Sequence, residues 1–190
     1  MNRKRTTQYV IRVGVLAALA WALMLVEVPL LPAATYLKYD ASELPALVGA
    51  FALGPVAGVL IELIKNVLYL LLSGKGTLVG EAANFLAGAV WVTVAGGIYW
   101  RHKTRWLAGI SLVAGSLAMT AVMAVANAYI FLPLWNVPQA AIPAMVLSVV
   151  TPFNLLKAGL SSAITFVAYK RVRGYLALEA KPVAAALPRS

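Results

Sequence analysis

Long apolar stretches separated by short polar breaks dominate the pattern of this chain. The stretches cover residues 9–28, 44–73, 80–100, 106–132 and 143–169, and prolines, glycines or basic clusters close them. A helix that crosses the hydrocarbon core of a bilayer needs about 20 mostly apolar residues. The pattern therefore predicts an all-α integral membrane protein.

The stretch at residues 44–73 is too long for one crossing. As a single helix it would extend about 45 Å, whereas the hydrocarbon core is about 30 Å thick. Gly54 and Pro55 lie inside it, and glycine commonly ends a helix while proline opens one. We therefore expect a short second helix over residues 44–53. Its bend should be covered by protein, because unpaired backbone is not tolerated against lipid.

The distribution of basic residues supports six transmembrane helices rather than five. The chain has 16 Lys and Arg against 6 Asp and Glu, a net charge of +10. With six helices, the basic residues near the N-terminus, at 101–105 and at 170–173 share one side, and Lys38 and Lys75 fall on the other. Cytoplasmic loops are enriched in Lys and Arg, so both termini are predicted to be cytoplasmic. We expect one six-helix transmembrane domain at residues 1–173 and a disordered cytoplasmic tail at residues 174–190.

Composition excludes several classes of function. Hydrophobic residues make up 62% of the chain and charged residues 12%, which excludes an ordinary soluble enzyme and a disordered chain. Cysteine is absent and His102 is the only histidine, so neither a thiolate metal site nor a histidine acid–base pair is expected. Residues 74–77 are not a phosphate loop, because Gly76 occupies the place of the required hydroxyl. We therefore predict no enzyme, no ATP hydrolysis by this chain alone, and no nucleic-acid partner.

Polar side chains within the apolar stretches are informative because an ionised group at the bilayer centre costs about 2.5–3.5 kcal/mol. Glu62 and Lys65 are three residues apart, a spacing that allows an internal ion pair on one helix. Lys157 has no acid within a helical turn, so either an acid from another segment or a polar ligand should approach it. Other polar residues share the external half of the predicted bundle, which favours a common cavity: Asp40, Glu81, Asn84, Asn127 and Asn154.

Two further patterns leave alternatives open. Aromatic residues also gather on the external side, where either an interfacial belt or a flat heteroaromatic ligand would explain them: Tyr36, Tyr39, Tyr129, Phe131 and Trp135. Gly14, Ala18 and Ala22 form a smooth stripe at four-residue spacing on the first helix. The stripe suits either packing inside the bundle or docking of a partner membrane protein.

Several segments, taken in order, resemble one transporter family. They are residues 36–47 (YLKYDASELPAL), 51–58 (FALGPVAG), 65–66 (KN), 80–88 with NFLAG at its end, 127–129 (NAY) and 152–157 (PFNLLK). The ordered set resembles the substrate-binding S components of energy-coupling factor (ECF) vitamin transporters, most closely the riboflavin-specific branch. Glu43 departs from the pattern, where Asp is expected.

The resemblance implies a six-helix bundle in the bacterial cell membrane that captures riboflavin from outside, beneath the loop between helices 1 and 2. Riboflavin would be cargo, and no cofactor is expected. The matching ligand positions are Asp40, Asn84, Asn127, Asn154 and Lys157, with Leu37 and Lys38 in the covering loop. The stripe of Gly14, Ala18 and Ala22 would dock on the transmembrane coupling subunit, which two ATPase subunits drive.

Other functions stay open at this point. The chain could be an S component for FMN or thiamine instead of riboflavin. An intramembrane enzyme or a standalone carrier fits less well, because the catalytic constellations such an enzyme needs are missing.

Overall fold

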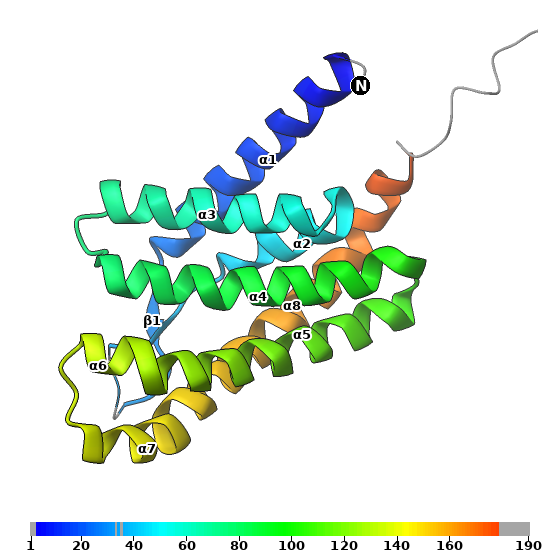
Figure 1. Ribbon diagram of the computed structural model, residues 1–190. Helices are drawn as coiled ribbons and strands as arrows, with labels where there is room; N and C mark the ends of the chain where they lie inside the picture. The colour runs from blue at the N-terminus through cyan, green and yellow to red at the C-terminus, as the bar shows by residue number, and fades with distance from the viewer. Residues whose placement is uncertain (1–2, 33, 35, 179–190) are drawn as a thin grey trace, which may run out of the picture.

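The computed structural model describes residues 3–178 apart from 33 and 35. Its helices form an elongated bundle in which α4 packs against α3 and α5, α8 packs against α5, and the short α2 contacts α1, α3, α4 and α8 (Figure 1). The principal helices are α1 (Arg3–Met24), α2 (Glu43–Leu53), α3 (Pro55–Leu72), α4 (Leu78–His102), α5 (Arg105–Ala126) and α8 (Thr151–Leu178).

Short elements connect the principal helices on the side of the bundle where α1 ends. Strands β1 (Val28–Pro29) and β2 (Lys38–Tyr39) form an antiparallel ribbon with Val28 opposite Tyr39. The helix α5 continues through a π-helical turn, η1 (Asn127–Phe131), into α6 (Leu132–Leu134). A 3-10 turn, η2 (Gln139–Ala141), then leads through α7 (Ile142–Met145) and a second π-helical turn, η3 (Val146–Val150), into α8.

The lengths of the helices agree with a membrane protein that has a short second helix. Five apolar helical segments of the described chain are long enough to cross a bilayer, the last two being Arg105–Leu134 and Gln139–Tyr169. The remaining apolar helix, α2, has 11 residues and extends only about 16 Å. The predicted all-α membrane architecture is confirmed, with α2 enclosed by the other helices.

Local sequence signals set the helix ends. Thr77 and Thr104 cap α4 and α5, their side-chain oxygens accepting the backbone N–H groups of Gly80 and Leu107 at 3.1 and 3.2 Å. Gly54 separates α2 from α3 with a φ of 111°, a conformation that glycine adopts most easily. These ends fall close to those expected from the sequence.

The bend between α2 and α3 is covered by protein, as the sequence predicted. The indole Nε1 of Trp100 donates to the backbone oxygens of Ala50 and Phe51, at 2.8 and 3.2 Å. Helix ends leave backbone carbonyls without intrahelical partners. The indole therefore supplies a hydrogen-bond donor to carbonyl groups in the last turn of α2, where the chain reverses.

Replacing Trp100 by Phe should lower the stability of the folded protein by about 1 kcal/mol, because the Phe51 carbonyl loses its donor. The measurement is thermal unfolding of the purified protein in detergent. Trp106→Phe is the control, since that side chain is 78% exposed. Equal melting temperatures for Trp100→Phe and the wild type would contradict this role.

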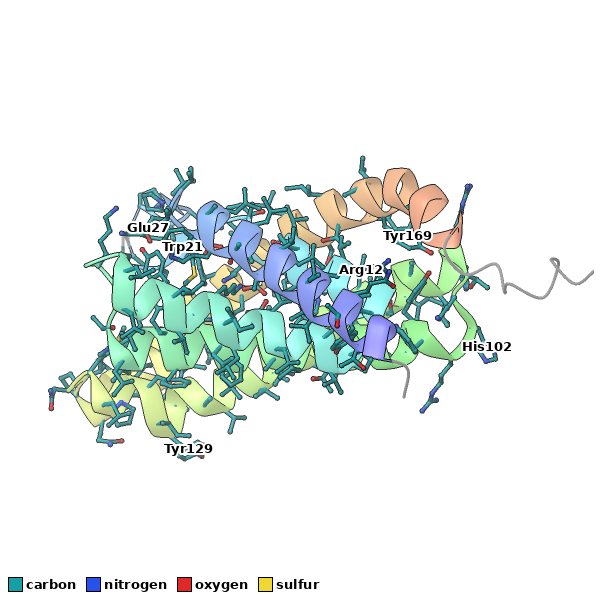
Figure 2. All side chains as sticks on the ribbon, turned by 90° about the horizontal axis from the view of Figure 1, so that it is seen from above. Arg12, Trp21, Glu27, His102, Tyr129 and Tyr169 are labelled. Atoms are coloured by element: carbon teal, nitrogen blue, oxygen red, sulfur yellow. The ribbon has the colours of Figure 1, made fainter. Side chains whose placement is uncertain are left out.

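The two ends of the bundle differ in charge. His102 and its basic neighbours in the α4–α5 turn lie at one end of the bundle, and Glu27 lies at the other (Figure 2). The N-terminus, the α2–α3 bend and the far end of α8 share the end with the basic turn (Figure 1). Since the basic end faces the cytoplasm, the end that carries the ribbon faces outward. The helix α8 runs on to Leu178, so the first part of the expected tail is helical, and residues 179–190 lie outside the described residues.

Candidate ligand-binding site

A cavity of about 680 Å³ opens at the outward end of the bundle. This volume lies within the range of about 300–1,000 Å³ typical of sites for small molecules. Its wall comes from the end of α1, the loop before α2, the helical elements α3, α4, α5, η1, α6, α7, η3 and α8, and the loops after α3 and α6. All seven residues expected to bind a ligand line it: Leu37, Lys38, Asp40, Asn84, Asn127, Asn154 and Lys157.

Two buried asparagines of the cavity wall hydrogen-bond to their own helical segment through the amide nitrogen. The Nδ2 of Asn127 donates to the Met123 carbonyl at 2.8 Å, and the Nδ2 of Asn154 donates to the Val150 carbonyl at 2.9 Å. Neither Oδ1 accepts a hydrogen bond from the described residues, so both remain available to a donor on a ligand. Asn127 begins the π-helical turn η1 and Val150 ends η3. Such turns are frequent at functional sites because they redirect side chains.

The Lys157 ammonium has an acidic partner from another helix. Its Nζ donates to Asn84 Oδ1 at 2.8 Å and forms an ion pair with Glu43 Oε1 at 3.2 Å. The sequence left a distant acid and a ligand as alternatives for Lys157, and the structure supplies the acid from α2. Lys157 still lines the cavity, so its remaining donor capacity is available there.

A buried cluster of charges lies behind Lys157. Lys65 Nζ lies 2.9 Å from Glu62 Oε2, 3.2 Å from Glu43 Oε1 and 2.7 Å from Ser42 Oγ. Side-chain exposure of these charged residues is at most 1%. The predicted pair of Glu62 with Lys65 is confirmed, whereas the central place of Glu43 was missed because it lies far along the chain from both lysines. When ionised, the two acids balance Lys65 and Lys157, which offsets part of the cost of burying charge.

The loop between α1 and α2 covers one side of the cavity mouth. Lys38 pairs with Glu27, and the Tyr69 hydroxyl donates to Glu27 Oε2 at 3.1 Å. Asp40 is buried, and its Oδ1 accepts the Ser42 backbone N–H at 2.8 Å. The carboxylate of Asp40 therefore shapes the entry into α2 in addition to lining the cavity.

The aromatic residues divide between the two explanations offered by the sequence. Tyr36 and Trp135 line the cavity. Tyr129 is 80% exposed and points away from the bundle, as an interfacial residue would (Figure 2). Phe131 packs in the core, and the Tyr39 hydroxyl accepts a bond of 3.4 Å from Ser161.

Several residues of the wall were not expected from the sequence. The sequence puts Glu81 in the external half of the bundle but gives it no ligand-binding role. No sequence pattern indicates the other unexpected wall residues, which are Met24, Glu27, Tyr69, Met123, Met145 and Phe153. These residues come from different helices, and only the packing brings them together.

The small-residue stripe of α1 lies on the outside of the bundle. Gly14, Ala18 and Ala22 are exposed, and a Cβ added at Gly14 would meet no atom within 4 Å. Packing inside the bundle is therefore the wrong explanation for this stripe. An external helix can approach it closely.

Known proteins share this arrangement. The sequence profile of the family described as "ECF transporter, substrate-specific component" matches residues 8–169. The chain belongs to this family. As an S component, it is a transport protein of the bacterial cell membrane rather than an enzyme.

Individual relatives of this S component cover most of its length. The riboflavin transporter RibU of Staphylococcus aureus is 32% identical over 172 residues, which are 87% of this chain and 90% of that protein. The riboflavin transporter FmnP of Bacillus subtilis is 32% identical over 154 residues, which are 76% of this chain and 81% of that protein. A solved structure of the S component of a bacterial ECF transporter superposes with a TM-score of 0.77 at 32% identity, covering 90% of this chain and 98% of that one.

Proposed function

We propose that this chain binds riboflavin in its outward-facing cavity and delivers it to the cytoplasm as the S component of an ECF transporter. The observation that carries the proposal is that all seven residues implied by the family resemblance line one cavity. The names of the relatives support the choice of riboflavin, because both are riboflavin transporters.

The chemistry of the wall suits a flavin. The isoalloxazine ring of riboflavin is flat, with a polar pyrimidine edge that carries one N–H donor and several acceptors. Asn127 and Asn154 offer free carbonyl oxygens to the donor, and the Lys157 ammonium offers hydrogen to an acceptor. Tyr36, Trp135 and Phe153 provide apolar surface for the ring faces.

The other expected site residues have supporting roles in this proposal. Asn84 accepts from Lys157 and so orients it. Leu37 and Lys38 cover the bound ring from the loop, where the pair of Lys38 with Glu27 holds the loop near α1. Asp40 lies beneath that loop, at the start of α2.

Transport requires partners in this proposal. The exposed stripe of Gly14, Ala18 and Ala22 is the surface on which the transmembrane coupling subunit docks, and two ATPase subunits supply the energy. Riboflavin is the cargo in this scheme, and no cofactor takes part.

Titration of riboflavin into the purified protein in lipid nanodiscs tests the proposal. Riboflavin fluorescence should be quenched until one flavin is bound per chain, and thiamine should not compete. Folded protein that leaves the fluorescence unchanged would refute riboflavin binding. Displacement by FMN at equal concentration would favour the wider flavin specificity left open by the sequence.

Replacing Ala18 by Leu should abolish riboflavin uptake by vesicles that contain the coupling subunits, while riboflavin binding stays within twofold. A large side chain on the stripe keeps the partner helix away without touching the cavity. Ala121→Leu, at an exposed position of α5, is the control and should transport normally. Normal uptake by Ala18→Leu would show that the stripe is not the docking face, and uptake by the chain alone would favour a standalone carrier.

A further inference from the structure

Glu43 lies behind the proposed binding site without being part of its wall. It is fully buried at the start of α2, and its Oε1 lies 3.2 Å from the Lys157 ammonium. Together with Asn84 Oδ1, at 2.8 Å, this carboxylate occupies two of the three donor directions of Lys157. The remaining direction serves the cavity, which Lys157 lines.

The Glu43 carboxylate is itself fixed. The same Oε1 lies 3.2 Å from Lys65 Nζ. Lys65 in turn is held by Ser42 Oγ at 2.7 Å and Glu62 Oε2 at 2.9 Å. These contacts attach the Glu43 carboxylate to α3 through Lys65, independently of α8, which carries Lys157.

We propose that Glu43 is a positioning residue that holds the Lys157 ammonium in place before the flavin binds. This inference rests on the proposed function. A lysine side chain has many rotamers, and ordering it during binding lowers affinity. The ion pair with Glu43 orders it in the empty site. Glu43 therefore increases riboflavin affinity without contacting riboflavin.

Glu43→Gln should weaken riboflavin binding roughly tenfold, the order expected when one long side chain must be ordered during binding. Ser111→Ala is the control, because Ser111 is equally buried, its hydroxyl donates to the Ala108 carbonyl within α5, and it does not line the cavity. Both variants remove a buried polar interaction, but only Glu43→Gln removes the carboxylate beside Lys157. The control should bind riboflavin within twofold of the wild type, even where both variants melt at a lower temperature.

A double-mutant cycle separates positioning from a general effect on folding. Riboflavin dissociation constants are measured by fluorescence quenching for the wild type, Glu43→Gln, Lys157→Met and the double variant. We expect Glu43→Gln to raise the riboflavin dissociation constant about tenfold when Lys157 is present. In the Lys157→Met background it should leave the dissociation constant unchanged. An equal loss of riboflavin affinity in both backgrounds, or no loss when Lys157 is present, would overturn the inference.

Glu43→Asp provides the same test if Glu43→Gln fails to fold. This variant keeps the charge but shortens the side chain, so it should also weaken riboflavin binding only when Lys157 is present. A loss of affinity that persists in the Lys157→Met background would overturn the inference. A wild-type protein that binds no riboflavin would refute the proposed function. A wild type that binds riboflavin while Glu43→Gln binds equally well would refute only the positioning role.

Discussion

Lys157→Met should lower riboflavin affinity by roughly 10- to 100-fold, because the flavin loses a charge-assisted hydrogen bond of about 1.5–3 kcal/mol. The other lysines of the cavity wall, Lys38 and Lys75, are exposed, whereas Lys157 is buried. Methionine keeps most of the side-chain volume, so the shape of the wall is preserved. Fluorescence titration in nanodiscs measures the change.

Lys103→Met is the control for this prediction, since Lys103 is exposed at the cytoplasmic end of the bundle. It should bind riboflavin as the wild type does. Asn154→Ala should show a smaller loss than Lys157→Met, because a neutral hydrogen bond contributes about 0.5–1.5 kcal/mol. Wild-type affinity in Lys157→Met would show that the flavin does not contact this lysine.

Lys65→Met should lower the stability of the folded protein by about 3–5 kcal/mol, which corresponds to a fall in melting temperature of roughly 10 °C. Lys65 is fully buried and pairs with Glu62 at 2.9 Å and with Glu43 at 3.2 Å. Removing it leaves Glu62 without a positive partner among the described residues. Thermal unfolding in detergent provides the measurement.

Two companion variants make the result for Lys65 specific. Lys65→Met/Glu62→Gln should recover much of the lost stability, because it removes the carboxylate left uncompensated. Lys38→Met breaks an exposed pair with Glu27, and such pairs contribute about 0–1 kcal/mol. A Lys65→Met protein that melts as the wild type does, or that is not improved by Glu62→Gln, would contradict the account of the cluster.

The sequence predicted most of the fold because its signals are local. Apolar length, the Gly54–Pro55 break and the basic turn before α5 each depend on neighbouring residues. The end of α8 was placed too early, since basic residues were taken to close the helix. Lysine and arginine are good helix formers, so α8 continues past the membrane to Leu178.

The candidate site was only partly predictable. The shared depth of its asparagines indicated a cavity, and the structure brings them together. The pair of Glu43 with Lys157 was missed because it depends on how α2 and α8 are rotated against each other. The π-helical turns at Asn127 and before Asn154 depend on that packing as well, and no local residue pattern marked them.

The buried cluster links the covering loop to the cavity wall. Asp40 accepts the Ser42 N–H, Ser42 accepts from Lys65, and Lys65 pairs with Glu43. Glu43 then pairs with Lys157. The covering loop and Lys157 are therefore both connected to the buried pair of Lys65 and Glu43.

An experimental structure of the protein with riboflavin bound in a lipid environment tests the central claim most directly. The account predicts the isoalloxazine ring in the outward cavity, with its pyrimidine edge within hydrogen-bonding distance of Asn154 and Lys157. A flavin bound elsewhere, or a cavity that stays closed and filled by side chains at saturating riboflavin, would contradict it.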